Sequence, residues 1–337
     1  MTMPALASRI VPSGSLPFAA LFPGQLSEKA GMGEALAARF DFCSSFFDEI
    51  SRRSGVDLGG TFFGPGSPSL HDDLPAQVGV FAVSLAALDA LRRAHGLVPA
   101  AAAGYSLGTY AAFVASGCLD RWAALDVLLE AERLLDEDRR ANGENRGGMG
   151  FVIGLSREAI DVAIGGTGVA IGNENAGRQF VLTGEARSVA AAIERLRPSA
   201  LRAEMLPMRC PMHSNRLEEV CRALRNSFER KVGLRQPRLA LYAPTFGKEI
   251  STSEEISSVL FGQLAQPSLW AQTLRSMGAD GFSLFAEVGP GDVLTKLLRW
   301  TLREAQGHVV ESPETAAAFA GVAASVAPAA PEAASRA

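Results

Sequence analysis

The segment LVPAAAAGYSLG, residues 97–108, decides the fold. Its small apolar residues 97–103 predict a buried strand, and helical patterning follows over residues 110–116. A serine between two glycines at a strand-to-helix junction sits on a tight turn that lifts its hydroxyl above the sheet edge. The N-terminus of the next helix directs backbone N–H groups toward a developing oxyanion. Ser106 is therefore a candidate nucleophile. The alternative is an ordinary glycine-rich turn with a buried or capping serine, because Gly-x-Ser-x-Gly alone is common.

Two kinds of region flank this segment. The first is a large α/β region with predicted strands at residues 19–22 and 282–288 and predicted helices at residues 32–52, 77–95 and 122–140. The second is a strand–helix–strand–strand–helix pattern, with predicted strands at 150–155, 169–171 and 180–182 and helices at 157–164 and 187–195. This pattern predicts a small split-βαβ subdomain inserted into the α/β body.

The expected domain limits follow these changes of pattern. Residues 17–145 and 210–310 form the large subdomain, and residues 146–209 form the small one. The stretch from about Ser312 is rich in Ala and Pro. We therefore expect flexible termini at residues 1–16 and 312–337.

Composition narrows the function classes. The chain has 337 residues, of which 47% are hydrophobic and 20% charged, and its net charge is -4. A basic nucleic-acid platform, global disorder and a polybasic membrane anchor are therefore disfavoured. No apolar run is expected to span a bilayer, and the first ten residues are too weakly apolar for a signal peptide. The four cysteines form no CxxC pair, so neither a zinc site nor a disulfide framework is expected. A reduced cytoplasmic protein without metal is the expectation.

A serine nucleophile needs a base, and the chain has four histidines. His71 lies in a polar segment and is expected to be solvated, His95 ends a predicted helix, and His308 follows the last predicted helix. His213 follows Pro211 at a turn that presents an imidazole to a cleft. The alternative for His213 is a structural hydrogen bond at a helix N-terminus.

Five segments, in order, resemble one family. They are Phe22-Pro23-Gly24-Gln25, Gly104-Tyr105-Ser106-Leu107-Gly108, Pro211-Met212-His213-Ser214, Gln263-Leu264 with Pro267 and Trp270, and Glu287-Val288-Gly289-Pro290-Gly291. The chain resembles the malonyl-CoA:acyl carrier protein transacylases and the acyltransferases of polyketide synthesis. Each motif alone is weak, but the ordered set covers about residues 21–300.

The resemblance implies a fold and a set of roles. The fold is an α/β-hydrolase-like core with an inserted ferredoxin-like subdomain. Ser106 would be the nucleophile and His213 its general base and acid, oriented by the backbone carbonyl of Gln263. The backbone N–H groups of Gln25 and Leu107 would form the oxyanion hole. The acyl group would pass from CoA or an acyl carrier protein to a second thiol through an acyl-Ser106 ester, with no bound cofactor. Independently of the resemblance, Arg178, Arg209 and Arg216 are candidate contacts for a carrier protein, and the alternative is that they are ordinary solvated surface residues.

The chain departs from the family at the position that selects malonyl groups. Malonyl-using members carry an arginine in the helix after the serine, where it pairs with the free carboxylate. Counted without gaps from Ser106, that position holds Ala131, and Arg133 lies roughly 200° around the helix from it. We expect the arginine to be absent, although a two-residue insertion would bring Arg133 into its place.

Other departures concern the surroundings of the serine. Tyr105 replaces the family's usual histidine, and Leu26 replaces a glycine beside Gln25. Met212 stands in the segment associated with the choice of acyl group, and its flexible apolar side chain suits a neutral acyl tail. Tyr105, Ala131, Met212 and Asn175 are the expected substrate-binding residues.

Four functions fit these residues. The first is transfer of an acyl group other than malonyl between CoA or carrier-protein thioesters. The second is hydrolysis of carrier-protein thioesters on the same scaffold, and the third is malonyl transfer with Arg133 in register. The fourth, a docking module without catalysis, is disfavoured by the presence of both Ser106 and His213.

Overall fold

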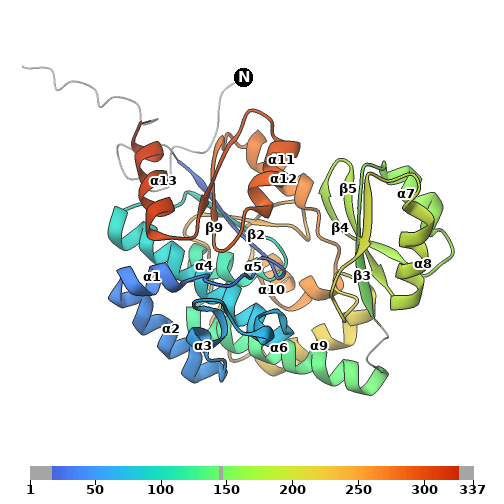
Figure 1. The fold of residues 1–337 in the computed structure, drawn as a ribbon, viewed down its shortest axis with the longest axis horizontal. Coiled ribbons are helices and arrows are strands. Elements are labelled where there is room, and N and C mark those ends of the chain that lie inside the picture. Colours follow the sequence, from blue (N-terminus) through green and yellow to red (C-terminus); the bar gives the residue numbers. More distant parts are fainter. Residues whose placement is uncertain (1–16, 144–146, 326–337) are drawn as a thin grey trace, which may run out of the picture.

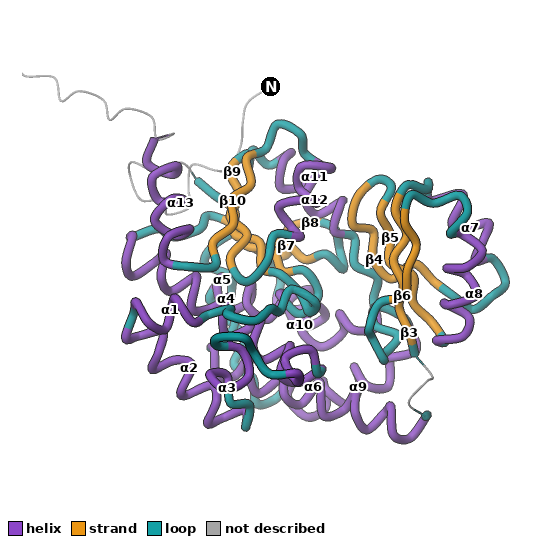
Figure 2. Tube along the Cα trace, in the orientation of Figure 1, coloured by secondary structure: helices purple, strands orange, loops and turns teal. Residues whose placement is uncertain are grey.

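The main sheet of the protein is mostly parallel. The computed structural model describes residues 17–143 and 147–325, and its six-stranded sheet has the order β10-β9-β1-β2-β7-β8 (Figures 1 and 2). Its strands are β1 (Ala19–Phe22), β2 (Ala101–Gly104), β7 (Ala240–Ala243), β8 (Lys248–Ile250), β9 (Leu284–Val288) and β10 (Gln306–Val310). All neighbours pair in parallel except β8, which pairs antiparallel with β7 at the edge. The central strands are buried along their whole length, as continuous apolar runs predict.

Helices cover both faces of this sheet. The longest are α2 (Asp41–Ser54), α4 (Asp73–His95) and α6 (Arg121–Asn142). The others are α1 (Glu34–Arg39), α3 (Leu58–Phe62), α5 (Gly108–Ser116), α9 (Glu218–Phe228), α10 (Ser253–Gly262), α11 (Trp270–Ala279), α12 (Val293–Thr301) and α13 (Pro313–Ser325). Ala20 and Phe22 of β1 pack into the core formed with α4, α5 and α6, whereas Ala19 and Leu21 face α11 and α12. This alternation follows from the two-residue period of a strand.

The second sheet is small and antiparallel, with the order β4-β5-β3-β6. Its elements in chain order are β3 (Gly148–Ile153), α7 (Arg157–Ile164), β4 (Ala170–Ala176), β5 (Gln179–Gly184), α8 (Ala186–Leu196) and β6 (Arg202–Met205). This βαββαβ order is the ferredoxin-like arrangement that the family resemblance implies. The sequence pattern predicted its first five elements but not β6. The sheet and its two helices form a separate body at one side of the molecule (Figure 1). It has its own core, which includes Ile160, Leu182, Val189 and Ile193.

One described helix is long and apolar enough to span a membrane by length and composition, although the sequence holds no uninterrupted apolar run of that length. This helix is α4. Its sixteen buried residues run from Ala76 to Leu91, and they pack inside the protein against α2, α5 and α6. An all-round apolar helix is also what the centre of a large core requires. Helix α4 is therefore a core helix here.

Two sequence expectations about helices need correction. The predicted helix over 32–52 is divided into α1 and α2, because Phe40 has an extended backbone with φ of −129°. The segment from Ser312, expected to be flexible, forms α13 up to Ser325. Ala316, Phe319 and Ala323 are buried along one side of α13, and the Phe319 ring meets that of Phe18 at 5.0 Å. The expected flexible termini at 1–16 and 326–337 lie outside the described residues.

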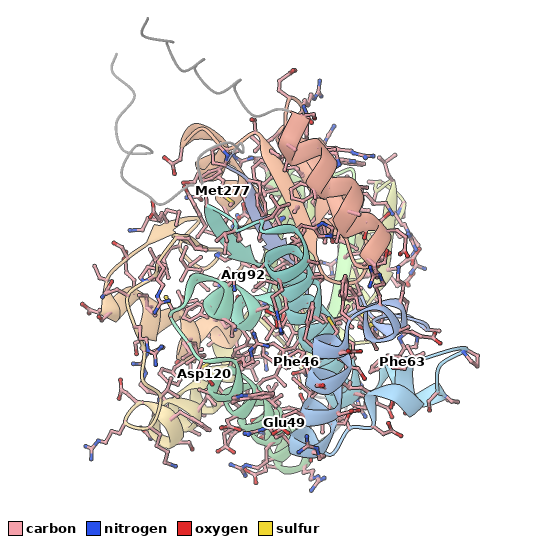
Figure 3. All side chains as sticks on the ribbon, turned by 90° about the vertical axis from the view of Figure 1, so that its left-hand side faces the viewer. Phe46, Glu49, Phe63, Arg92, Asp120 and Met277 are labelled. Atoms are coloured by element: carbon pink, nitrogen blue, oxygen red, sulfur yellow. The ribbon has the colours of Figure 1, made fainter. Side chains whose placement is uncertain are left out.

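Helix α2 forms part of the outer layer on the side shown in Figure 3. Phe46 is buried and packs against Trp122 of α6, with ring centroids 5.7 Å apart. One turn further, Glu49 forms ion pairs with Arg52 and Arg53 of the same helix. This division into an apolar and a charged face fixes the helix against the core.

Candidate active site

Ser106 stands at the junction of β2 and α5, on a turn that only glycines on either side permit. A Cβ on Gly104 would lie 2.2 Å from backbone atoms of Gly108, and one on Gly108 would lie 2.1 Å from the carbonyl oxygen of Phe22. Ser106 itself has a φ of +53°. The turn brings strand and helix into close contact and leaves the Ser106 side chain at the C-terminal edge of the parallel sheet.

His213 meets Ser106 from a different segment of the chain. Its Nε2 lies 2.9 Å from Ser106 Oγ. Its Nδ1 lies 3.1 Å from the carbonyl oxygens of both Gln263 and Gln266. The backbone N–H of His213 also donates to the carbonyl of Leu264 at 2.7 Å. The turn around residues 263–266 thus fixes the ring and leaves Nε2 facing the serine.

The electrostatics of this pair suit proton transfer. Because Nδ1 faces two carbonyl oxygens, it must carry the proton, and Nε2 is then an acceptor for the Ser106 hydroxyl. Burial lowers the pKa of His213, and the carbonyls of Gln266 and Gln263 oppose this shift. The ring is therefore neutral at neutral pH and able to accept a proton.

Backbone strain is concentrated at this site. Among the described residues, only Leu26, Ser106 and His213 combine a positive φ with a residue other than glycine, at +76°, +53° and +60°. All three line the same cavity. The left-handed region is costly for such residues and persists where the surrounding structure enforces it, most often at functional sites.

The loop after β1 supplies further groups. Within the described part of the chain, the backbone N–H groups of Gln25 and Leu107 donate to no protein acceptor, and both residues line the cavity beside Ser106. They are available as an oxyanion hole. The neighbouring N–H of Leu26 donates to Glu28 at 2.7 Å, and His71 Nδ1 lies 3.1 Å from the other oxygen of this buried carboxylate. The His71 side chain is 68% exposed, in agreement with the expectation that it is solvated, and it contacts this loop only through Glu28.

Asp73 joins this loop to the histidine segment. Its Oδ1 accepts from the side chain of Gln25 at 3.1 Å. Its Oδ2 accepts from Arg139 at 3.0 Å and from Arg209 at 2.8 Å. Arg209 precedes His213 by four residues, and Arg139 belongs to α6. One carboxylate therefore connects the oxyanion loop, helix α6 and the segment that carries the histidine.

The cavity in front of Ser106 has a volume of about 80 Å³ and is mainly apolar. It lies between α5, α6 and strands of the small sheet. Its lining residues are Gln25, Leu26, Gln77, Tyr105, Ser106, Leu107, Tyr110, Ala131, Leu135, Met149, Asn173, Val181, Leu206, Met208, Met212, His213, Gln263 and Leu264. No lysine, arginine, aspartate or glutamate is among them.

Helix α6 presents Ala131, not Arg133, to the cavity. Ala131 is buried and lines the wall. The Arg133 guanidinium lies on the surface, where it donates to Glu130 at 2.7 and 2.8 Å and also pairs with Glu137. Of the two residues considered for the carboxylate-binding position, Ala131 therefore lines the cavity and Arg133 does not.

These features can be compared with known proteins. A family model described as "Acyl transferase domain" matches residues 20–324, nearly the whole described chain. The chain belongs to this acyltransferase family. It is therefore an acyltransferase by family, as the five ordered motifs predict.

Individual relatives agree with the assignment. The malonyl CoA-acyl carrier protein transacylase of Bacillus subtilis is 27% identical, over 88% of this chain and 93% of that one. The polyketide biosynthesis protein ThaF of Burkholderia thailandensis is 32% identical over 92% of this chain, which spans only 26% of ThaF. A solved malonyl-transacylase in complex with a type II polyketide acyl carrier protein has a TM-score of 0.85 and 27% identity, covering 91% of this chain and 100% of that chain.

Of the four expected substrate-binding residues of the acyltransferase, three line the cavity and one does not. Tyr105 and Met212 line the cavity with Ala131, but Asn175 does not. Asn175 lies behind Tyr105 and accepts a hydrogen bond from its hydroxyl at 2.8 Å. Its neighbour on β4, Asn173, lines the cavity instead. The register of β4 shifts between Ile171 and Asn173 and again after Glu174, so strand alternation alone did not indicate which asparagine faces inward.

Several lining residues of the acyltransferase were missed at the sequence level. Gln77 is a polar residue within the apolar helix α4, and Tyr110 follows Ser106 by four residues. Both features were visible in the sequence and could have indicated a place near the site. The apolar wall residues gave none, because apolar residues on elements distant in sequence also form ordinary cores. Among the described residues no group of three or more His, Cys, Asp or Glu side chains is placed to hold a metal ion.

Proposed function

We propose that this acyltransferase moves neutral acyl groups, rather than malonyl, between the thioesters of CoA and an acyl carrier protein. The observation that supports this most directly is a cavity beside Ser106 that has Ala131 in its wall and, among the described residues, no lysine or arginine lining it. The acyl group would be held as an ester of Ser106 between the two transfers.

In the acylation half-reaction, the Ser106 hydroxyl loses its proton to His213 Nε2 as Oγ attacks the thioester carbonyl carbon. The carbonyl oxygen becomes an oxyanion and receives the N–H groups of Gln25 and Leu107. When the C–S bond breaks, the departing thiolate takes the proton from His213. A second thiol then repeats these steps in reverse. Every group named here belongs to the cavity described above.

The lack of a lysine or arginine among the described residues of the cavity wall argues against malonyl as the acyl group. A malonyl carboxylate placed in this cavity would lose its hydration without gaining an opposite charge. Burial of such an uncompensated charge costs on the order of several kcal/mol. Arg133 cannot offset this cost, because its guanidinium pairs with Glu130 and Glu137 on the surface. A neutral chain loses nothing comparable and gains apolar contacts with residues such as Leu135 and Met208.

An acyl carrier protein is the proposed partner. The related malonyl-transacylase was solved in complex with one. Beside Pro211, a second hollow is lined by Arg139, Arg209 and Arg216. Arg139 and Arg209 are paired with Asp73, so Arg216 is the arginine of this hollow whose positive charge would attract the acidic surface of a carrier protein. Arg178, the third arginine suggested by the sequence, does not line this hollow. A cytoplasmic location, where both thioesters would be present, is part of the proposal.

Intact-protein mass spectrometry tests the proposal. The protein is incubated briefly with acetyl-CoA, butyryl-CoA or malonyl-CoA, and the Ser106→Ala variant is the control. We expect mass increases of acetyl and butyryl groups that are absent from Ser106→Ala, and little malonyl adduct. Preferential malonyl labelling would refute the choice of substrate, and labelling of Ser106→Ala would refute the nucleophile.

The same samples distinguish transfer from hydrolysis. Addition of a phosphopantetheinylated carrier protein should discharge the acyl-enzyme onto the carrier thiol, and the carrier's mass should rise. If CoA is released continuously while no adduct accumulates and the carrier stays unloaded, the protein is a thioester hydrolase on the same scaffold.

A further inference from the structure

A buried carboxylate that the proposed reaction does not use stands next to the cavity wall. Glu132 belongs to α6, and its side chain is only 8% exposed. It follows Ala131, which lines the cavity together with Leu135. Successive residues of a helix are about 100° apart, so Leu135 lies about 40° from Ala131 and Glu132 about 60° further round. Glu132 therefore stands at the flank of the helix face that lines the cavity.

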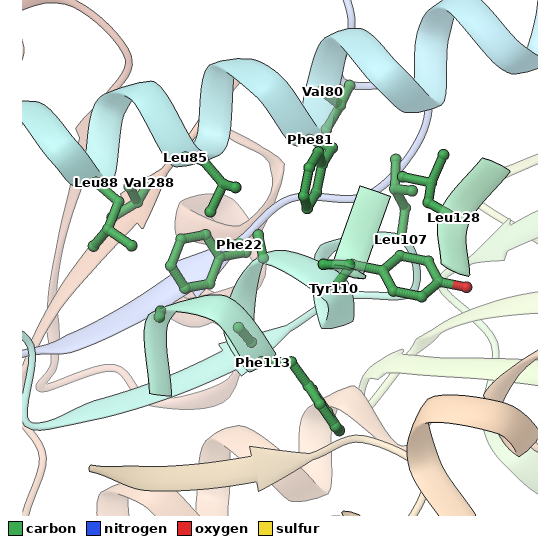
Figure 4. Packing of buried hydrophobic residues seen from close by; sticks show 14 of the residues in the cluster. Phe22, Val80, Phe81, Leu85, Leu88, Leu107, Tyr110, Phe113, Leu128 and Val288 are labelled. Carbon is green, nitrogen blue, oxygen red and sulfur yellow. The ribbon is translucent and has the colours of Figure 1, made fainter. Parts of the chain in front are cut away.

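A glutamine of helix α4 connects this carboxylate to the cavity. Phe81 of α4 and Leu128 of α6 lie on either side of Leu107, which lines the cavity (Figure 4). One turn before Phe81, Gln77 lines the cavity as well, and one turn after Leu128 comes Glu132. Gln77 Nε2 donates to Glu132 Oε2 at 2.7 Å. A single side chain thus separates the Glu132 carboxylate from the cavity.

This hydrogen bond fixes the direction of the Gln77 amide. A carboxylate only accepts hydrogen bonds, so the amide nitrogen of Gln77 must face Glu132. The carbonyl oxygen of the same amide is then directed away from Glu132, on the side of the cavity. This oxygen is the negative end of the amide dipole. The wall at Gln77 therefore presents partial negative charge, with a carboxylate behind it.

The charges around Glu132 leave this part of the protein short of positive charge. Arg139 lies 3.2 Å from Glu132, but the same guanidinium also pairs with Asp73 and Asp136. Arg209 is 57% exposed, where solvent screens its pairing with Asp73. Two largely buried carboxylates, Asp73 and Glu132, thus share one largely buried guanidinium. Burial and the charge of Asp73 raise the pKa of Glu132, which shows that negative charge is already disfavoured there.

We propose that Glu132, acting through Gln77, makes the cavity reject acyl groups that carry a negative charge. A carboxylate beside the Gln77 oxygen would be repelled by the amide dipole and by Glu132, in surroundings of low dielectric constant. A neutral acyl group meets no such repulsion. Glu132 does not line the cavity, so it is a positioning residue that determines specificity. This inference rests on the proposed transfer of neutral acyl groups and adds a repulsive cause to the lack of a cation.

The test compares two thioesters of nearly the same shape that differ in charge. They are malonyl-CoA and malonamoyl-CoA, in which an amide replaces the free carboxylate. The rate of acyl-Ser106 formation is measured by rapid-quench intact mass. Glu132→Gln keeps the shape of the side chain, removes its charge and allows the Gln77 amide to turn its nitrogen toward the cavity. Asp136→Asn is the matched control, because Asp136 also pairs with Arg139 but belongs to the next turn of α6.

We expect the native protein to prefer malonamoyl-CoA over malonyl-CoA by roughly tenfold or more. Glu132→Gln should narrow this preference by about fivefold, through faster reaction of malonyl-CoA alone, and Asp136→Asn should preserve it. An unchanged preference in Glu132→Gln would overturn the inference. An equal change of both rates would do so as well, because it would show that Glu132 has a structural role.

A second variant covers the case in which Glu132→Gln does not fold. Gln77→Met removes the amide from the wall and leaves Glu132 paired with Arg139. The preference should narrow by about twofold, and an unchanged preference would overturn the inference on its own. The proposed function fails in a different way. Failure of both butyryl-CoA and malonamoyl-CoA to label Ser106 in the native protein would contradict the transfer of neutral acyl groups itself.

Discussion

Ala131 and Arg133 stand two positions apart on α6 and lie on different sides of the helix. The methyl group of Ala131 lines the cavity beside Ser106, while the Arg133 guanidinium pairs with Glu130 and Glu137 at the surface. Two residues correspond to about 200° of rotation in an α-helix. The charge of the cavity is therefore set by one residue position, and the arginine in the sequence does not change it.

Substitution Ala131→Arg should give the cavity a partner for a carboxylate. We expect acylation by malonyl-CoA to rise by at least tenfold. The new guanidinium would pair with the malonyl carboxylate and offset its desolvation cost, which is on the order of several kcal/mol. Acylation by butyryl-CoA should fall, since the side chain occupies its space. The measurement is the rate of Ser106 labelling by intact mass.

Arg133→Ala is the matched control for this change. It removes a surface guanidinium from the same helix, so the ratio of malonyl to butyryl labelling should stay as in the native protein. Loss of malonyl labelling in Arg133→Ala would show that Arg133 reaches the substrate and would contradict the register described here.

Asp73 is expected to position the oxyanion loop. In Asp73→Asn the side chain no longer offers a carboxylate to Gln25, Arg139 and Arg209 at once. We expect the rate of acylation to fall by about tenfold, with a loss of about 1–3 kcal/mol in the free energy of unfolding. Rapid-quench labelling and urea unfolding measure the two effects.

Asp136→Asn is the control that distinguishes the positioning of the oxyanion loop by Asp73 from the mere loss of an ion pair with Arg139. Asp136 also pairs with Arg139, at 2.9 Å, but does not contact Gln25. Its substitution should leave the rate of acylation within about twofold of the native value. A comparable slowing in both variants would mean that α6 stability, rather than the loop, is responsible.

The sequence predicted those parts of the fold that depend on local pattern. The strand at Ala19–Phe22 has the expected bounds, and the strand before Ser106 ends where the glycine-rich turn begins. The βαββαβ order was recognisable even though β6 was missed. Helix α13 was not foreseen, because an Ala- and Pro-rich composition is shared by flexible tails. Its stability depends on Phe319 packing against Phe18, a contact across about 300 residues of sequence.

The candidate site, too, was predictable where it depends on sequence motifs and unpredictable where it depends on contacts in space. Ser106, His213 and Gln263 were found because their motifs occur in order along the chain, and the structure brings them together. The part played by Asp73, the inward position of Asn173 and the contact of Gln77 with Glu132 depend on which side chains meet in space. A single sequence gives no measure of such contacts.

The pH dependence of acylation should reflect the lowered pKa of His213. The ring accepts a proton only when neutral, so the rate should stay near its maximum through pH 6.5 and fall with a midpoint below that ordinary value. A midpoint above 6.5 would contradict the environment described for the ring. The measurement is the rate of labelling from pH 4.5 to 8.

Stability should depend on pH in the same window. The folded pKa of His213 is lowered, so the unfolded state binds more protons between that pKa and about 6.5. The free energy of unfolding should therefore be highest above pH 6.5 and decrease as pH falls below it. Burial lowers the pKa of His308 as well. His308→Gln should reduce this decrease and leave the pH profile of acylation unchanged, because His308 lies outside the cavity.

Substitution of Leu26 by glycine is expected to raise the stability of the protein while it impairs the function of the site. The φ of Leu26, +76°, lies in the region that favours glycine, and the residue is 38% exposed. In Leu26→Gly, relief of a left-handed conformation that costs about 1–2 kcal/mol should exceed the added unfolded-state entropy of about 0.4–1 kcal/mol. We expect the free energy of unfolding to rise by about 0.5–1 kcal/mol in urea titrations.

The same substitution should impair the site. Leu26 lines the cavity, so its removal admits water, and the acyl-Ser106 ester should be hydrolysed several-fold faster in the absence of a thiol. Leu26→Ala is the control, since it opens the cavity but keeps the strained backbone: its ester should also be short-lived, without the gain in stability. A Leu26→Gly protein that is less stable than the native one, with an ester of unchanged lifetime, would show that Leu26 serves packing rather than the exclusion of water.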